Sequence, residues 1–174
     1  MLALSKKDIE KLFAALNQEL QRMQVVGELY LVGGAVMCLV FEARPSTRDL
    51  DAFFRPTSQI RTAAANVALQ MGIEESWLND SVKGFLSDTG EFNSYLELQN
   101  LRIFVAKAEY LFAMKCMAMR IGEEFRDLDD IRYLIRHLDI RSYQQALILI
   151  EQYYPPTRIP QKTLYALEEI LQAN

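Results

Sequence analysis

The segment between residues 29 and 54 constrains the fold of this chain more than any other. An apolar run ends at the glycine pair Gly33-Gly34, and a later apolar run opens with two alternate aspartates, Asp49 and Asp51. Alternation places both carboxylates on one face of a strand, and the glycines turn the chain from a first strand into a helix. Two carboxylates this close repel each other, and a hard divalent cation relieves that repulsion. The pattern therefore predicts a Mg²⁺ site, beside glycines at a helix N-terminus that suit a phosphate.

Length, composition and charge limit the size of the fold and the kinds of partner that we expect. The chain has 174 residues, 51% of them hydrophobic, which is enough for one domain, or one domain with a small helical appendage, to bury a normal core. A net charge of −4 argues against a protein that coats nucleic acid through bulk charge. A single histidine and the lack of a Cys-x-x-Cys motif predict no zinc site. We expect a cytoplasmic protein without a membrane partner, because no signal peptide is recognised and the longest apolar run falls short of the ~20 residues of a membrane span.

Hydrophobic periodicity and turn residues predict the order α-β-α-β-α-α-β-β, followed by four helices. In the first part of the chain we expect helices at 5–23, 35–42, 57–71 and 74–85, and strands at 29–32, 49–54, 94–98 and 101–105. In the second part we expect helices at 108–120, 123–138, 142–153 and 161–171. This order predicts an α/β (α+β) fold, with a small mixed sheet and flanking helices over 1–106 and a C-terminal helical bundle over 107–174 packed on it.

Four sequence blocks, covering residues ~28–137, resemble a known superfamily. An apolar strand with a glycine pair, a helix and then Thr47-Arg-Asp-Leu-Asp51 is similar to the DNA polymerase beta-type nucleotidyltransferases. The strings Lys115-Cys-Met-Ala-Met-Arg120 and Arg126-Asp-Leu-Asp-Asp-Ile131 resemble the Lys-x-x-Ala-x-x-x-Arg-like and Arg-Asp-x-x-Asp motifs of the AbiEii-type minimal nucleotidyltransferases. Members of that group occur as toxins of bacterial toxin–antitoxin pairs and as stand-alone proteins.

The resemblance implies transfer of a nucleoside monophosphate from an NTP to a hydroxyl group. Asp49 and Asp51 would hold Mg²⁺ or Mn²⁺, and Lys115 would neutralise the triphosphate or the leaving pyrophosphate. Asp127 or Asp130 would order Lys115 or the acceptor. The residues implied to bind the nucleotide are Gly33, Gly34, Thr47 and Arg48. The implied partners are an NTP, an RNA end or a protein as acceptor, a cognate antitoxin, and a second copy of the chain.

Departures from the family pattern keep other functions open. Larger members carry a third carboxylate on a later strand, but the strand at 101–105 has none, and Glu97 is the nearest candidate. Ala35 stands where many active members have a serine, and the spacing from Lys115 to Arg120 is loose. One alternative is therefore a catalytically degenerate nucleotidyltransferase fold that only binds a nucleotide or a partner. Another is an interaction protein whose C-terminal helices bury an apolar face against a partner.

Charged residues around these motifs also have two interpretations. The aspartate pair is flanked by Arg44, Arg48, Arg55 and Arg61, which form either a basic rim for a nucleotide or RNA, or a solvated loop. Lys115 is either a site residue or a surface lysine that lays its stem along an apolar helix. Arg126 and Asp130 are four residues apart, so they form either a surface ion pair or part of the site.

Overall fold

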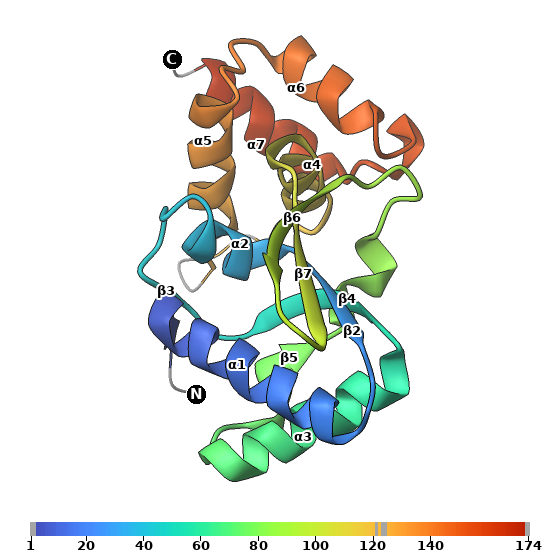
Figure 1. Ribbon diagram of the computed structural model, residues 1–174. Helices are drawn as coiled ribbons and strands as arrows, with labels where there is room; N and C mark the ends of the chain where they lie inside the picture. The colour runs from blue at the N-terminus through green and yellow to red at the C-terminus, as the bar shows by residue number, and fades with distance from the viewer. Residues whose placement is uncertain (1–2, 121, 123–124, 173–174) are drawn as a thin grey trace. The chain divides into compact units, whose positions relative to one another are not determined.

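The computed structural model describes residues 3–120, 122 and 125–172, which fall into two compact units. The first unit contains the chain up to Gly84 together with Phe92–Ala106, and the second contains Phe85–Glu91 together with the chain from Lys107 onward. Figure 1 shows the helices and strands of both. The predicted fold class is confirmed, because the chain forms a mixed five-stranded sheet with flanking helices, followed by further helices.

The first unit contains every strand of the described chain. Its strands are β1 (Leu4–Ser5), β2 (Gly27–Leu31), β3 (Ser46–Thr47), β4 (Leu50–Arg55), β5 (Leu78–Asn79), β6 (Phe92–Glu97) and β7 (Leu101–Ala106). Its helices are α1 (Lys6–Arg22), α2 (Gly33–Leu39) and α3 (Thr57–Met71). The predicted cap of α1 is confirmed, because the Ser5 and Asp8 side chains each bond the other's backbone N–H.

The sheet has the strand order β5-β4-β2-β7-β6, and β1 and β3 form a separate two-stranded pair. The central strand β2 runs antiparallel to β4 and parallel to β7. The strand β5 runs parallel to β4, and β6 runs antiparallel to β7. The carboxylate-bearing strand β4 is therefore next to the strand that leads into the glycine pair.

Helices α1 and α3 cover one face of this sheet. Both helices meet at Gly27 of β2, where an added Cβ would lie 2.9 Å from Leu20 of α1 and 3.1 Å from Ile60 of α3. The strand residues on this face are fully buried or nearly so, and include Leu29, Leu31, Ala52, Phe54 and Ile103. Their alternation with less buried neighbours follows from the two-residue period of a strand. The apolar core of the first unit therefore lies between the sheet and these two helices.

The other face of the sheet carries aromatic and charged side chains. Tyr30 of β2 stacks on Phe104 of β7 with ring centroids 4.7 Å apart, and it also contacts the rings of Phe53 and Phe92. The guanidinium of Arg55 lies 5.4 Å from the centre of the Tyr30 ring. Asp51 lies two residues before Phe53 on β4, so both side chains are on this face of the sheet.

The second unit is built around α4 (Ala108–Met117), which is buried along nearly its whole length. The helices α5 (Asp127–His137), α6 (Tyr143–Glu151) and α7 (Gln161–Gln172) complete it. The Thr163 hydroxyl of α7 donates a hydrogen bond of 2.7 Å to the Cys116 carbonyl of α4, and both side chains are buried. Within the described residues, no helix combines the length and the apolar character that crossing a bilayer requires.

Candidate functional site

The glycine pair lies directly beside the carboxylate of Asp51. After β2, the Val32 N–H donates to the Asp51 carbonyl over 3.0 Å, which aligns the end of β2 with the start of β4. Gly33 has a φ of +64°, a conformation that residues with a side chain rarely adopt. A Cβ added to Gly33 would lie only 3.1 Å from Asp51 Oδ2. Both the backbone conformation and this close approach therefore favour a glycine at residue 33.

The two aspartates lie on either side of the first residue of β4. Asp51 is the second residue of the strand, whereas Asp49 lies in the bend before it, so the predicted strand start at residue 49 is one residue early. The Asn79 amide donates to Asp49 Oδ2 over 3.3 Å, and the Ser81 hydroxyl lies 3.5 Å from Asp51 Oδ1. Asn79 and Ser81 are themselves joined, with Ser81 Oγ 2.6 Å from Asn79 Oδ1. One polar network therefore connects both carboxylates.

Sequence reasoning missed Asn79 and Ser81 because it predicted a helix over 74–85. That helix is wrong: two 3-10 turns, Glu75–Trp77 and Ser81–Phe85, flank the short strand β5. The Trp77 indole N–H donates to the Ala64 carbonyl of α3, and Leu78 and Asn79 then pair with Leu50 and Asp51. The polar run Asn79-Asp-Ser81 after a buried tryptophan and leucine was the available signal.

Glu97 does not lie beside the aspartate pair. It ends β6, and the strands β2 and β7 separate β6 from β4 in the sheet. Three strand spacings amount to about 14 Å, beyond the reach of a shared cation. Glu97 pairs with Arg102 instead, with an Oε1–Nε distance of 3.4 Å. The position opposite Asp51 on the adjoining strand is occupied by the amide Asn79, not by a third carboxylate.

Thr47 and Arg44 border the second glycine of the pair. Thr47 is buried on β3, and its hydroxyl donates to the Asp49 carbonyl over 3.2 Å. A Cβ on Gly34 would lie 2.7 Å from Thr47 Oγ1 and 2.8 Å from Arg44 Nη1. Arg48, predicted to bind the nucleotide, is exposed. Gly34 therefore has to lack a side chain, although its φ is not in the left-handed region.

Arg55 and Arg61, which were predicted as part of a basic rim, are held by acidic partners. Arg55 Nε lies 2.5 Å from Glu28, and Arg61 Nη2 lies 2.6 Å from Asp80. Their charges are therefore largely compensated within the first unit.

A buried ionic cluster joins α4 and α5 in the second unit. Lys115 Nζ lies 2.9 Å from Asp127 Oδ1 and 2.7 Å from Asp130 Oδ2, and at most 9% of any of the three side chains is exposed. Arg120 also binds Asp127, with its side-chain Nε at 2.9 Å and its backbone N at 3.1 Å. Interpreting Lys115 as a surface lysine is therefore wrong, as is placing Asp130 in a surface ion pair. The expected helix start at Glu123 lies outside the described residues.

The cluster changes the acidity of Asp127. Burial raises the pKa of its carboxyl, but the hydrogen bond from Arg120 and the nearby charge of Lys115 outweigh burial and lower the pKa to about 2. The carboxylate is therefore ionised at neutral pH and holds both cations.

The two groups of predicted site residues belong to different units. Gly33, Gly34, Thr47, Asp49 and Asp51 come together in the first unit, whereas Lys115, Asp127 and Asp130 come together in the second. That both groups serve one site stays a prediction.

The donor set of the first unit suits a hard cation. It offers two carboxylates, an amide oxygen and a hydroxyl, which are oxygen ligands of the kind that Mg²⁺ accepts together with water. Over the described ranges, no group of three or more histidine, cysteine or acidic residues is arranged to hold a metal ion. A cation here would therefore rest on the aspartate pair and complete its coordination with water or phosphate oxygens.

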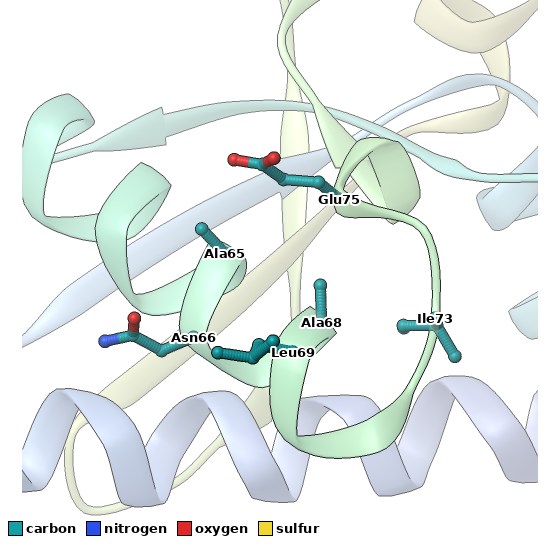
Figure 2. A pocket seen from close by; sticks show the side chains of 6 residues that line it. All are labelled: Ala65, Asn66, Ala68, Leu69, Ile73 and Glu75. Atoms are coloured by element: carbon teal, nitrogen blue, oxygen red, sulfur yellow. The ribbon is translucent and has the colours of Figure 1, made fainter.

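A separate hollow of about 410 Å³ lies between α3 and the segment that follows it. Figure 2 shows its lining residues, which are Ala65, Asn66, Ala68, Leu69, Ile73 and Glu75. The Asn66 amide donates to Glu19 of α1 over 2.8 Å, so it helps to join the two helices. None of the lining residues belongs to the aspartate network.

Fold and site together define a class: an α/β protein whose mixed sheet presents an aspartate pair against a glycine turn. No protein-family model, curated protein or solved structure matches the chain.

Replacing Gly33 by alanine should destabilise the protein more than replacing Gly72. Both glycines have a φ of +64°, which costs a residue with a Cβ about 1–2 kcal/mol. A Cβ at Gly72 meets nothing within 4 Å, whereas at Gly33 it meets Asp51. We expect Gly33→Ala to cost about 1 kcal/mol more than Gly72→Ala in urea unfolding followed by circular dichroism. Equal losses of unfolding free energy in the two variants would show that Asp51 does not clash with a side chain at residue 33.

Proposed function

We propose that this protein is a Mg²⁺-dependent nucleotidyltransferase that moves a nucleoside monophosphate from an NTP to a hydroxyl acceptor. The observation that carries this proposal is the 3.1 Å approach of a Gly33 Cβ position to Asp51 Oδ2. This approach brings the backbone of the glycine turn directly against a carboxylate that can hold a cation, which is the arrangement that a metal-bound phosphate chain needs. The resemblance of residues 47–51 to the superfamily motif supports the same assignment.

In the proposed reaction, the acceptor hydroxyl oxygen forms a bond to the α-phosphorus of the NTP. The bond from that phosphorus to the oxygen bridging to the β-phosphate breaks, pyrophosphate leaves, and the hydroxyl proton passes to water. Asp49 and Asp51 would hold Mg²⁺ or Mn²⁺, which supplies charge neutralisation at the phosphates. Asn79 holds Asp49, and Thr47 holds the backbone before β4, so the protein's own part is positioning.

The acceptor and the partners belong to the same proposal. We propose an RNA end or a protein hydroxyl as acceptor, a cytoplasmic location, and a toxin-like role with a cognate antitoxin, while a homodimer stays a prediction. The contribution of Lys115, Asp127 and Asp130 to catalysis also stays a prediction, since their mutual ion pairs already account for their burial.

A second candidate is a nucleotide-binding module without turnover. Asn79 favours it, because an amide stands opposite Asp51 on the neighbouring strand. An amide cannot ionise, so it attracts a cation less strongly than a carboxylate and cannot accept a proton from the hydroxyl.

Calorimetric titration of the full chain with each of the four NTPs tests the proposal, in Mg²⁺ and in EDTA. We expect one NTP to bind in Mg²⁺ and at least about tenfold more weakly in EDTA. Release of pyrophosphate on addition of cellular RNA or protein then separates an enzyme from a binding module. The absence of NTP binding under both conditions would refute both functions.

A further inference from the structure

The two glycines of the pair face groups of opposite charge. The Cβ position of Gly33 lies 3.1 Å from the Asp51 carboxylate, and that of Gly34 lies 2.8 Å from Arg44 Nη1. A carboxylate and a guanidinium therefore flank one short stretch of bare backbone. This arrangement matches a metal-bound phosphate chain, in which the cation sits on a carboxylate and the remaining phosphate oxygens need a donor of hydrogen bonds.

Arg44 is held in this position by the loop that carries it. The loop leaves α2 and turns back on it, because the Ala43 N–H donates to the Met37 carbonyl over 3.0 Å. The side chain is half-buried, and its Nε atom is enclosed by protein. The guanidinium is thus placed before any ligand arrives, which reduces the entropy lost on binding.

An arginine suits this role better than a lysine. Its planar guanidinium presents several N–H donors in a fixed fork, which fits two phosphate oxygens at once. Because Gly34 has no side chain, the fork lies against the backbone beside the Thr47 hydroxyl. An exposed arginine such as Arg48 would have to be ordered by the ligand itself.

We infer that Arg44, rather than Arg48, is the cation that binds the phosphate chain of the nucleotide. This inference rests on the proposed function and adds a binding residue to it. Asp49 and Asp51 then hold the metal side of the phosphate chain, and Arg44 holds the side that borders Gly34.

Binding of phosphate compounds to Arg44→Gln, Arg44→Lys and Arg48→Gln tests this assignment. The probes are the magnesium complexes of the four NTPs, the NDP and NMP of the base that binds, and inorganic tripolyphosphate. We expect Arg44→Gln to weaken NTP and tripolyphosphate binding about ten- to a hundredfold and NMP binding less than about threefold. Arg44→Lys should fall between Arg44→Gln and the unchanged protein, and Arg48→Gln should bind within about threefold of it.

The outcomes distinguish failure of this inference from failure of the proposed function. If the unchanged protein binds an NTP and Arg44→Gln binds it equally well, the inference is refuted and the proposed function stands. A larger loss in Arg48→Gln than in Arg44→Gln refutes the inference in the same way. A purely structural role of Arg44 would lower binding of NTP and NMP alike and would also refute it. If Arg44→Gln does not fold, as judged by circular dichroism, the ratio of NTP to NMP affinity in Arg44→Lys decides between these outcomes.

Discussion

Exchanging Asp49 and Asp51 together for asparagine should weaken Mg²⁺-dependent NTP binding at least about a hundredfold. The amide keeps the size of each side chain but removes the negative charge that holds the cation against the phosphates. Both aspartates sit in a network with Asn79 and Ser81. The measurement is calorimetric titration in Mg²⁺ and in EDTA, and the residual binding in the variant should no longer depend on the metal.

The matched control removes the same two charges elsewhere. Asp88 and Asp129 are exposed, so Asp88→Asn/Asp129→Asn should leave NTP binding within about threefold. The Asp49/Asp51 variant should still fold, as judged by circular dichroism, because asparagine keeps the size of aspartate. Metal-dependent binding that survives in the Asp49/Asp51 variant would show that the cation binds elsewhere.

Replacing Lys115 by methionine should destabilise the protein by about 3–5 kcal/mol at neutral pH. Methionine fills similar space but leaves the carboxylates of Asp127 and Asp130 buried without the ammonium that both contact. The control is Lys107→Met, which removes an ion pair with Glu91 whose side chains are 39% and 50% exposed. That change should cost less than about 1 kcal/mol. Urea unfolding at pH 7, followed by circular dichroism, measures both.

The pH dependence gives this prediction a second readout. The pKa of Asp127 is lowered to about 2, so its interactions add stability above about pH 4, and that stability is lost as the pH falls towards 2. In Lys115→Met, protonation of a carboxylate on acidification relieves the penalty. The difference between the variant and the unchanged protein should therefore shrink below about pH 4. A difference that stays constant down to pH 3 would mean that lost packing, rather than charge, is responsible.

Local patterns in the sequence were sufficient to predict that the glycine pair and the aspartates lie close together. The strand β2, the glycine pair and the strand β4 lie close together in sequence, with only α2 and β3 between them, and β2 pairs with β4 directly. Asp127 and Asp130 were expected on one face of a helix because they are three residues apart, and both contact Lys115.

Features that depend on distant contacts could not be predicted in this way. The two-residue strand β5 exists because Leu78 and Asn79 pair with β4, and no periodicity extends over two residues. Glu97 was a candidate only because the order of the strands along the chain does not predict their order in the sheet. The burial of Lys115 follows from the packing of α4 in the second unit. The apolar residues around Lys115 in the sequence fit a surface lysine as well as a buried one.

The central position of β2 also affects the chain while it is being synthesised. One edge of β2 pairs early, through Leu31 with Ala52 of β4, but the other edge pairs through Gly27 with Leu101 of β7. Until β7 leaves the ribosome, the backbone groups along that edge lack their strand, and nascent chains can join there into intermolecular sheets. Fragments that stop before residue 101 keep this edge permanently, so a shortened version of the first unit invites aggregation even though it retains both glycines and both aspartates.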